Sequence, residues 1–221
     1  MEDHSPPTAP GQTPESTPVV LGPKDERREK SDRHMLRAAI ALISKHGSVG
    51  ASLAQIGLDA GYSRGLPAQR FGTKLKLLET VADATAERFD QLVAERTAGK
   101  RGCEALAARI RAQMEAVRDA PEAATAVYHL MVDAIGSVPE LKPRVAALHE
   151  GYRRSIRKHV LEARQMGELQ EGVDVEETVR AIQGVISGLC LQALIAGDTA
   201  RLTRDAEVAA NLLIGSIRKT S

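Results

Sequence analysis

Glycine and proline residues divide this chain into helix-length segments, and this division constrains its fold more than any other feature. Between the breaks, apolar residues recur at helical spacing, and no segment shows a convincing strand-like alternation. Aromatic residues make up only 2% of the chain and Trp is absent. A core of Leu, Ala, Val, Ile and Met favours helices, because strands are enriched in aromatic and β-branched residues. The sequence therefore predicts an all-α fold of about nine helices.

The breaks also predict where the helices begin and end. The first helix should run from about Lys24 to Lys45 and end at Gly47. Ser52 should then cap a short second helix. Ser63 should cap a third helix of one or two turns, and Thr73 a much longer fourth helix. Further helices are expected over residues 103–118, 121–135, 140–166, 174–196 and 201–219.

Composition and helix pattern divide the chain into three parts. Residues 1–23 hold six of the ten prolines and cannot bury enough apolar surface to fold, so we expect a disordered Pro-rich tail. Residues 24–72 contain the first three predicted helices and form a helix-turn-helix module. Residues 73–221 form a larger helical domain.

Charge is distributed unevenly between these parts. Residues 24–78 hold eleven Lys or Arg against five Asp or Glu, whereas residues 79–221 hold 19 against 21. A basic module on a nearly neutral body suggests a polyanionic partner such as DNA. An ordinary solvated surface is the other explanation, and charge alone does not separate the two.

The basic module contains side chains suited to reading bases. Two short helices joined by a tight, glycine-containing turn can present a helix end to the major groove of DNA. Arg64, at the start of the third predicted helix, can donate to O6 and N7 of guanine. Gln69, on the same helix, carries the amide that suits adenine edges.

Other side chains of the module are suited to holding phosphates. Ser52 can offer its hydroxyl, together with the N–H groups of a helix start, to a phosphate oxygen. Arg70 and Lys74 flank the end of the third helix, where phosphates would lie. Helix caps and core packing would explain some of the same residues, so the helix-turn-helix spacing alone is weak evidence.

A longer pattern strengthens this interpretation, and it consists of Ala38-Ala39, Gly47, Ser52-Leu53-Ala54-Gln55-Ile56, Ala60-Gly61-Tyr62-Ser63-Arg64-Gly65, Phe71-Gly72-Thr73-Lys74 and Leu77-Leu78. The pattern resembles the N-terminal module of the TetR family of transcriptional regulators. That resemblance implies a homodimeric regulator, usually a repressor, which a small-molecule effector releases from its DNA operator. It also implies a DNA-binding helix from Ser63 through Arg70, which includes Gly65 and Leu66.

Three positions depart from the pattern of that family. Ala68 stands where a Tyr is usual, Pro67 replaces an apolar residue, and Arg70 replaces a His or Tyr. Loss of the Tyr should weaken the hold on phosphates, which Arg70 would offset, while an early Pro forfeits at most one backbone hydrogen bond. A second hypothesis therefore stays open: a helical small-molecule-binding or interaction protein with a degenerate DNA-binding module.

The last two predicted helices, within residues 174–219, are strongly apolar on one face. An intrachain helical hairpin would explain this pattern, whereas the family resemblance favours a homodimer through a four-helix interface. In such a dimer, two recognition helices held about 34 Å apart would bind a pseudo-palindromic operator in double-stranded DNA.

An effector pocket is expected among the segments from about residue 85 to 160. The candidate lining residues are Phe89, Met114, Val117, Tyr128, Met131, Val132 and Tyr152, with His129 or Asp133 as a polar anchor. Each of them is also explained by ordinary core packing. The scarcity of aromatic residues permits an aliphatic ligand, but the effector itself is not evident from the sequence.

No cofactor, metal site or catalytic motif is expected. His129 and Asp133 supply two metal ligands where a catalytic zinc needs three, and no phosphate-binding loop or nucleophile elbow is present. No apolar run approaches the roughly 20 residues of a membrane span, and no secretory signal is apparent. We therefore expect a cytoplasmic protein that is not an enzyme and contacts no membrane.

Overall fold

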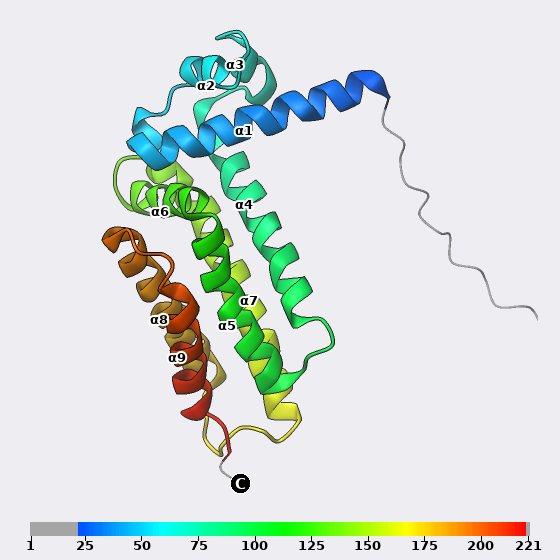
Figure 1. Ribbon diagram of the computed structural model, residues 1–221, viewed down its shortest axis with the longest axis vertical. Coiled ribbons are helices and arrows are strands. Elements are labelled where there is room, and N and C mark those ends of the chain that lie inside the picture. Colours follow the sequence, from blue (N-terminus) through cyan, green and yellow to red (C-terminus); the bar gives the residue numbers. More distant parts are fainter. Residues whose placement is uncertain (1–21, 220–221) are drawn as a thin grey trace, which may run out of the picture.

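The computed structural model describes residues 22–219, and this part of the chain is all-α (Figure 1). Its nine α-helices are α1 (Pro23–Gly50), α2 (Leu53–Asp59), α3 (Leu66–Phe71), α4 (Lys74–Thr97), α5 (Gly102–Asp119), α6 (Pro121–Ile135), α7 (Lys142–Gln165), α8 (Val175–Ala196) and α9 (Leu202–Gly215). A short 3₁₀ turn, η1 (Pro139–Leu141), precedes α7. The predicted fold class is confirmed. The predicted disordered tail lies outside the described residues, apart from its last two positions.

The helices form a small module at one end of a longer bundle (Figure 1). Helix α1 crosses that end, with α2 and α3 on its outer side and α6 directly beneath it. Helices α4, α5 and α7 run along the length of the molecule, and α8 and α9 form an antiparallel hairpin on the side away from α4. Helix α6 is therefore in contact with both the module and the bundle.

Local sequence signals set the ends of the N-terminal helices. Gly47 has a φ of 70° and interrupts α1, so that the first regular helix ends where the glycine predicts, with one further turn up to Gly50. Ser52 caps α2, because its hydroxyl accepts a hydrogen bond from the Gln55 amide at 3.2 Å. Thr73 caps α4 in the same way.

The predicted cap of α3 is wrong. Helix α3 begins at Leu66, after Gly65, and Ser63 makes no side-chain capping bond. Pro67 is the reason, because its ring fixes a helical φ and it lacks an N–H, so it is favoured in the first turn of a helix rather than further in. The Ser63 carbonyl instead accepts a hydrogen bond from the Leu66 amide at 3.2 Å and closes a turn before the helix.

The apolar core continues from the small module into the bundle. One buried cluster joins Met35 and Ile43 of α1 and Leu78 of α4 to Leu130 of α6. A second cluster lies within the bundle and is formed mainly by α5, α7, α8 and α9. Because α1 and α6 share one close-packed cluster, a displacement of α6 changes the packing of α1.

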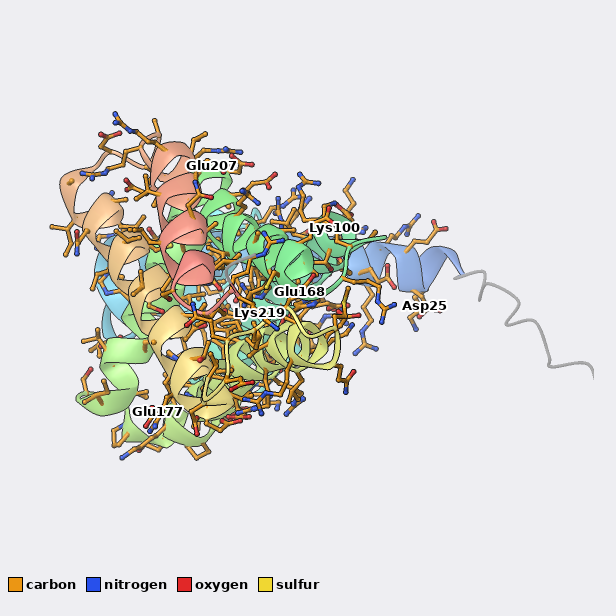
Figure 2. The ribbon with its side chains drawn as sticks, turned by 90° about the horizontal axis from the view of Figure 1, so that it is seen from below. Asp25, Lys100, Glu168, Glu177, Glu207 and Lys219 are labelled. Carbon is orange, nitrogen blue, oxygen red and sulfur yellow. The ribbon has the colours of Figure 1, made fainter. Side chains whose placement is uncertain are left out.

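The C-terminal end of the bundle is closed by backbone pairing. Helix α9 ends at Gly215 rather than at the expected residue 219. The segment beyond it pairs with the loop that follows α7: the Gln170 amide donates to the Ile217 carbonyl at 2.9 Å, and the Lys219 amide donates to the Glu168 carbonyl at 2.8 Å. Figure 2 shows Glu168 and Lys219 close together at this end.

Candidate functional site

Helices α2 and α3 are held together by a close approach at Gly57. A β-carbon added there would lie 2.5 Å from the Ser63 carbonyl oxygen and 3.1 Å from the Pro67 ring. The Gly57 carbonyl also accepts a hydrogen bond from the Tyr62 amide at 2.8 Å. Only glycine fits this position, so the sharp turn between the two helices depends on it.

The turn and α3 present an exposed polar face. Ser63, Arg64, Gly65 and Gln69 are all exposed. Leu66 differs, because it is half-buried and packs against the apolar cluster that joins the module to the bundle. Arg64 lies in the turn before α3, since the helix begins two residues later.

Ser52 is exposed at the start of α2. Its oxygen already accepts the capping hydrogen bond, but its hydroxyl proton is available for donation to a phosphate oxygen. The structure therefore leaves the predicted phosphate contact chemically open.

Arg70 is engaged within the module. Its Nε donates to Asp32 Oδ1 at 2.9 Å, and its Nη2 donates to the Arg28 carbonyl at 3.1 Å. Both partners belong to α1, and the Arg70 side chain is largely buried. In this conformation Arg70 fixes α3 to α1, so a phosphate would have to compete with Asp32 for its guanidinium.

Lys74 is engaged in a similar way. Its Nζ donates to the Val49 carbonyl at 2.7 Å and so satisfies a carbonyl at the end of α1. Burial lowers the pKa of the Lys74 ammonium, and the charge of Asp133 opposes that shift. Lys74 therefore fixes the end of α1 to the start of α4.

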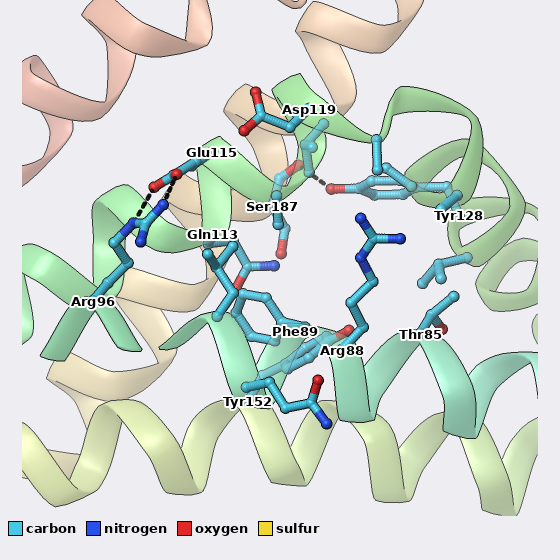
Figure 3. A pocket seen from close by; sticks show the side chains of 18 of the residues that line it. Thr85, Arg88, Phe89, Arg96, Gln113, Glu115, Asp119, Tyr128, Tyr152 and Ser187 are labelled. Carbon is cyan, nitrogen blue, oxygen red and sulfur yellow. Dashed lines mark hydrogen bonds and ion pairs between the residues drawn. The ribbon is translucent and has the colours of Figure 1, made fainter. Parts of the chain in front are cut away.

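The bundle contains a cavity of about 400 Å³ between α4, α5, α6 and α8 (Figure 3). A volume in this range suits a small organic ligand. Five of the seven predicted lining residues border it: Phe89, Val117, Tyr128, Met131 and Tyr152. Their role in binding an effector stays a prediction.

The other two predicted lining residues and both predicted polar anchors lie elsewhere. Met114 is fully buried in the bundle cluster on another face of α5. Val132 points outward and is 65% exposed. His129 faces α1, because its Nδ1 is 3.6 Å from the position of a β-carbon built on Gly47.

The periodicity of α6 explains this sorting. Residues 127, 128 and 131 lie on the cavity side of the helix, whereas His129 and Asp133, four residues apart, share the side that faces α1. The Asp133 carboxylate bonds to Ser48 rather than to the cavity. Neither of the two predicted polar anchors therefore reaches the ligand space.

The polar groups that do line the cavity were missed by the sequence reasoning. They are Thr85, Arg88, Gln91, Gln113, Gln183 and Ser187, besides the ion-paired residues of the rim. Gln183 was detectable in principle, because it is a polar residue among the buried apolar residues of α8. Arg88 and Gln113 gave no such signal.

A buried polar group lies behind the cavity wall. Arg109 is fully buried, and its Cζ lies 4.7 Å above the Phe89 ring centre. Burial lowers the pKa of Arg109 to about 10 and raises the pKa of Tyr152 to about 12. The Tyr128 hydroxyl donates to the Ser187 carbonyl at 2.9 Å and fixes α6 to α8 across the cavity.

The outward faces of α8 and α9 are apolar. Large exposed residues on them are Val185, Leu191, Ile195, Val208 and Leu212. Contrary to the sequence expectation, α8 is long and apolar enough to cross a membrane by length and composition, although core helices of globular proteins meet the same criterion. Within residues 22–219 no group of three potential metal-ligating side chains is found.

The C-terminal half of the chain matches a known protein family. The family model described as "Tetracyclin repressor-like, C-terminal domain" matches residues 102–209. No curated protein matches the sequence.

Solved structures resemble nearly the whole chain. A TetR transcriptional regulator from Chloroflexus aurantiacus has a TM-score of 0.73 at 20% identity, covering 88% of this chain and 100% of that one. The regulator FadR from Bacillus subtilis, in complex with stearoyl-CoA, has a TM-score of 0.73 at 20% identity, covering 82% and 97%. The complex of SmeT, a repressor from Stenotrophomonas maltophilia, with triclosan has a TM-score of 0.73 at 20% identity, covering 86% and 93%.

Proposed function

We propose that this chain is a TetR-family transcriptional regulator, a cytoplasmic repressor that binds a pseudo-palindromic operator as a homodimer and is released by a small molecule. In this proposal, residues 24–72 bind DNA, and residues 73–221 bind the effector and dimerise. The chain acts by binding alone and is not an enzyme. Two of the similar structures are complexes with small molecules, stearoyl-CoA in one and triclosan in the other.

The observation that carries the proposal is the exposed polar face of the turn and α3. Ser63 and Arg64 are exposed in the turn whose close approach requires Gly57, and Gln69 is exposed on α3. Arg64 and Gln69 are side chains that read guanine and adenine edges. Ser52 lies exposed at the adjacent helix start, where it can donate to a phosphate.

The homodimer is supported by the uncovered apolar faces of α8 and α9. Ile195 is 78% exposed and Leu212 is 68% exposed, which is unusual for side chains of this size. A second copy of the same hairpin would cover both faces in a four-helix interface. Such a dimer would place the two α3 helices on successive major grooves, about 34 Å apart.

Release by a ligand is supported by the position of α6. Its residues Val127, Tyr128 and Met131 line the cavity, while its other side packs against α1. A ligand that displaces α6 would change the separation of the two DNA-binding modules. Because specific base contacts tolerate little displacement, this change would release the operator.

Binding to DNA from the upstream region of the gene tests the proposal, with fluorescence anisotropy measured over a range of salt concentrations. We expect Arg64→Ala to remove the preference for the operator over unrelated DNA. Lys74→Ala should weaken binding to all sequences alike. Arg154→Ala, which removes the same charge from an exposed site on α7, should change neither.

The outcomes separate the two hypotheses. Absence of any specific complex at low salt would leave a small-molecule-binding protein with a degenerate DNA-binding module. Equal effects of Arg64→Ala and Lys74→Ala would contradict the separate roles of base reading and phosphate binding.

A further inference from the structure

The buried guanidinium of Arg109 has only neutral hydrogen-bond partners. Its Nε donates to Ser155 Oγ at 3.0 Å, and its Nη1 donates to Gln113 Oε1 at 3.1 Å. Its Nη2 is buried and has no partner. Asp90 attracts the Arg109 charge but makes neither a hydrogen bond nor an ion pair with it among the described residues. A positive charge so poorly compensated is costly to bury.

Arg109 determines which way the amide of Gln113 points. A guanidinium can only donate hydrogen bonds, so Gln113 must turn its oxygen toward Arg109. Its amide nitrogen is then left to donate elsewhere. Gln113 lines the cavity and lies beside Phe89 and Tyr152 (Figure 3). This wall of the cavity therefore offers hydrogen-bond donors, with a positive charge immediately behind them.

A second amide borders the same space with one end unpaired. Gln183 lines the cavity and is more than nine-tenths buried. Its Nε2 donates to Ser187 Oγ at 3.0 Å, whereas its Oε1 is buried without a partner. Because this oxygen can only accept hydrogen bonds, an anionic group is not favoured beside Gln183.

The carboxylates at the cavity rim lie beside arginines. Glu115 is bound by Arg96, which also lies 3.9 Å from Glu95. Asp119 accepts two hydrogen bonds from Arg118. In the described part of the chain Arg88 has no ion pair, and its guanidinium extends over the cavity (Figure 3). Arg88 and Arg109 are thus two positive charges beside the cavity that form no ion pair among the described residues.

We propose that this cavity binds an amphipathic ligand with a carboxylate head. The carboxylate accepts hydrogen bonds from the Gln113 amide nitrogen and compensates the charge of Arg109. Its apolar part packs against the aliphatic side of the lining: Leu92, Ala116, Val117, Ala123, Ala124 and Val127. The inference rests on the proposed function, because it takes this cavity as the effector site.

Three probes with the same tail test the head group by isothermal titration calorimetry on the full chain. Decanoate, decanol and decylammonium differ only in the charge and hydrogen bonding of the head. We expect decanoate to bind at least about tenfold more tightly than decanol, which corresponds to about 1.4 kcal/mol. Decylammonium should bind most weakly, because its charge has the same sign as Arg109 and Arg88.

Gln113→Glu is the informative variant. It places a carboxylate beside Arg109, so it neutralises that charge and removes the amide donors without opening a hole. We expect the variant to unfold at a temperature no lower than the native chain and to lose the preference for decanoate. Gln165→Glu is the matched control, because it makes the same change at an exposed position of α7 outside the cavity, and it should keep the preference.

The proposal is overturned if decanoate does not bind, if the native chain binds decanoate and decanol equally, or if Gln113→Glu keeps the preference. Operator binding is measured separately, with no probe added. Loss of operator binding alone would contradict the proposed regulator, whereas loss of the carboxylate preference alone would contradict only the ligand class.

Discussion

Asp133 of α6 holds Ser48 of α1 through two hydrogen bonds: its Oδ2 accepts from the Ser48 amide at 3.0 Å and from the Ser48 hydroxyl at 2.5 Å. Ser48 follows the interruption of α1 at Gly47 and is fully buried. The pair therefore connects the helix that lines the cavity to the last turn of the first helix of the proposed DNA-binding module. Both His129 and Asp133 were expected to line the pocket, whereas they face this junction.

Replacing Asp133 with Ala should loosen this connection. The buried Ser48 amide would lose its acceptor, at an expected loss of about 1–3 kcal/mol in the free energy of unfolding. Chemical denaturation measures that loss, and hydrogen exchange should become faster at residues 47–50. Ser137→Ala is the control, because it removes the third hydrogen bond to Asp133, at 2.8 Å, without touching α1. Equal hydrogen exchange at residues 47–50 in both variants would argue against a link between the helices.

The same carboxylate should make stability depend on pH in the acid range. Burial alone would raise the pKa of Asp133, but the hydrogen bonds from Ser48 and Ser137 outweigh it, so that the pKa is lowered. Because the folded pKa is below the unfolded value of about 3.9, the stabilisation is complete above that value and is lost as the pH falls through the folded pKa. The destabilisation by Asp133→Asn should therefore be largest near neutral pH and shrink in acid. If the difference in unfolding free energy between the native chain and Asp133→Asn grew on acidification, the predicted direction of the pKa shift would be contradicted.

Gly57→Ala should disrupt the turn between α2 and α3. The added methyl would meet the Ser63 carbonyl at 2.5 Å, a backbone atom that cannot rotate away. We expect a loss of about 1–3 kcal/mol in stability, measured by thermal unfolding, together with weaker operator binding. Gly151→Ala is the matched control on α7, where nothing lies within 4 Å of the new β-carbon. That variant should gain about 0.5–1 kcal/mol, since Ala is the better helix former. Similar losses in both variants would contradict the steric argument.

The ion pair between Arg70 and Asp32 should hold Arg70 away from DNA. Its atoms Nε and Oδ1 are 2.9 Å apart. A double-mutant cycle with Arg70→Ala and Asp32→Ala should give a coupling of about 1 kcal/mol in the free energy of unfolding. Asp32→Ala alone should strengthen binding to DNA of any sequence, because it removes a negative charge and frees Arg70 for a phosphate. Unchanged DNA binding of Asp32→Ala at low salt would show that Arg70 fixes α3 to α1 and does not contact phosphates.

Charged substitutions on α8 and α9 should separate the proposed dimer. Ile195→Glu and Leu212→Glu place carboxylates on the exposed apolar faces, and sedimentation velocity should then show a monomer. Ile135→Glu is the control, because Ile135 is 84% exposed on α6 and so equally accessible. A dimer that survives both substitutions, or that is lost with Ile135→Glu, would place the interface elsewhere.

The sequence by itself determined the helices and the module at the N-terminus. Gly and Pro end a helix through their own backbone properties. Ser52 and Thr73 each cap a helix by accepting a hydrogen bond from the backbone amide three residues later. Such effects are local, so the helices from α5 to α8 could be placed within a few residues. The start of α3 was missed because Pro67 outweighed Ser63, although that effect is local as well.

Only the tertiary structure decided which face of each helix meets the cavity. Tyr128 and His129 are neighbours in the sequence, yet the first lines the cavity and the second faces α1. Arg70 and Lys74 found partners 38 and 25 residues away, and Arg109 came to lie behind Gln113 and Phe89. These contacts depend on the rotation and crossing of packed helices, which periodicity leaves undetermined, because every face of a helix is compatible with the same local backbone.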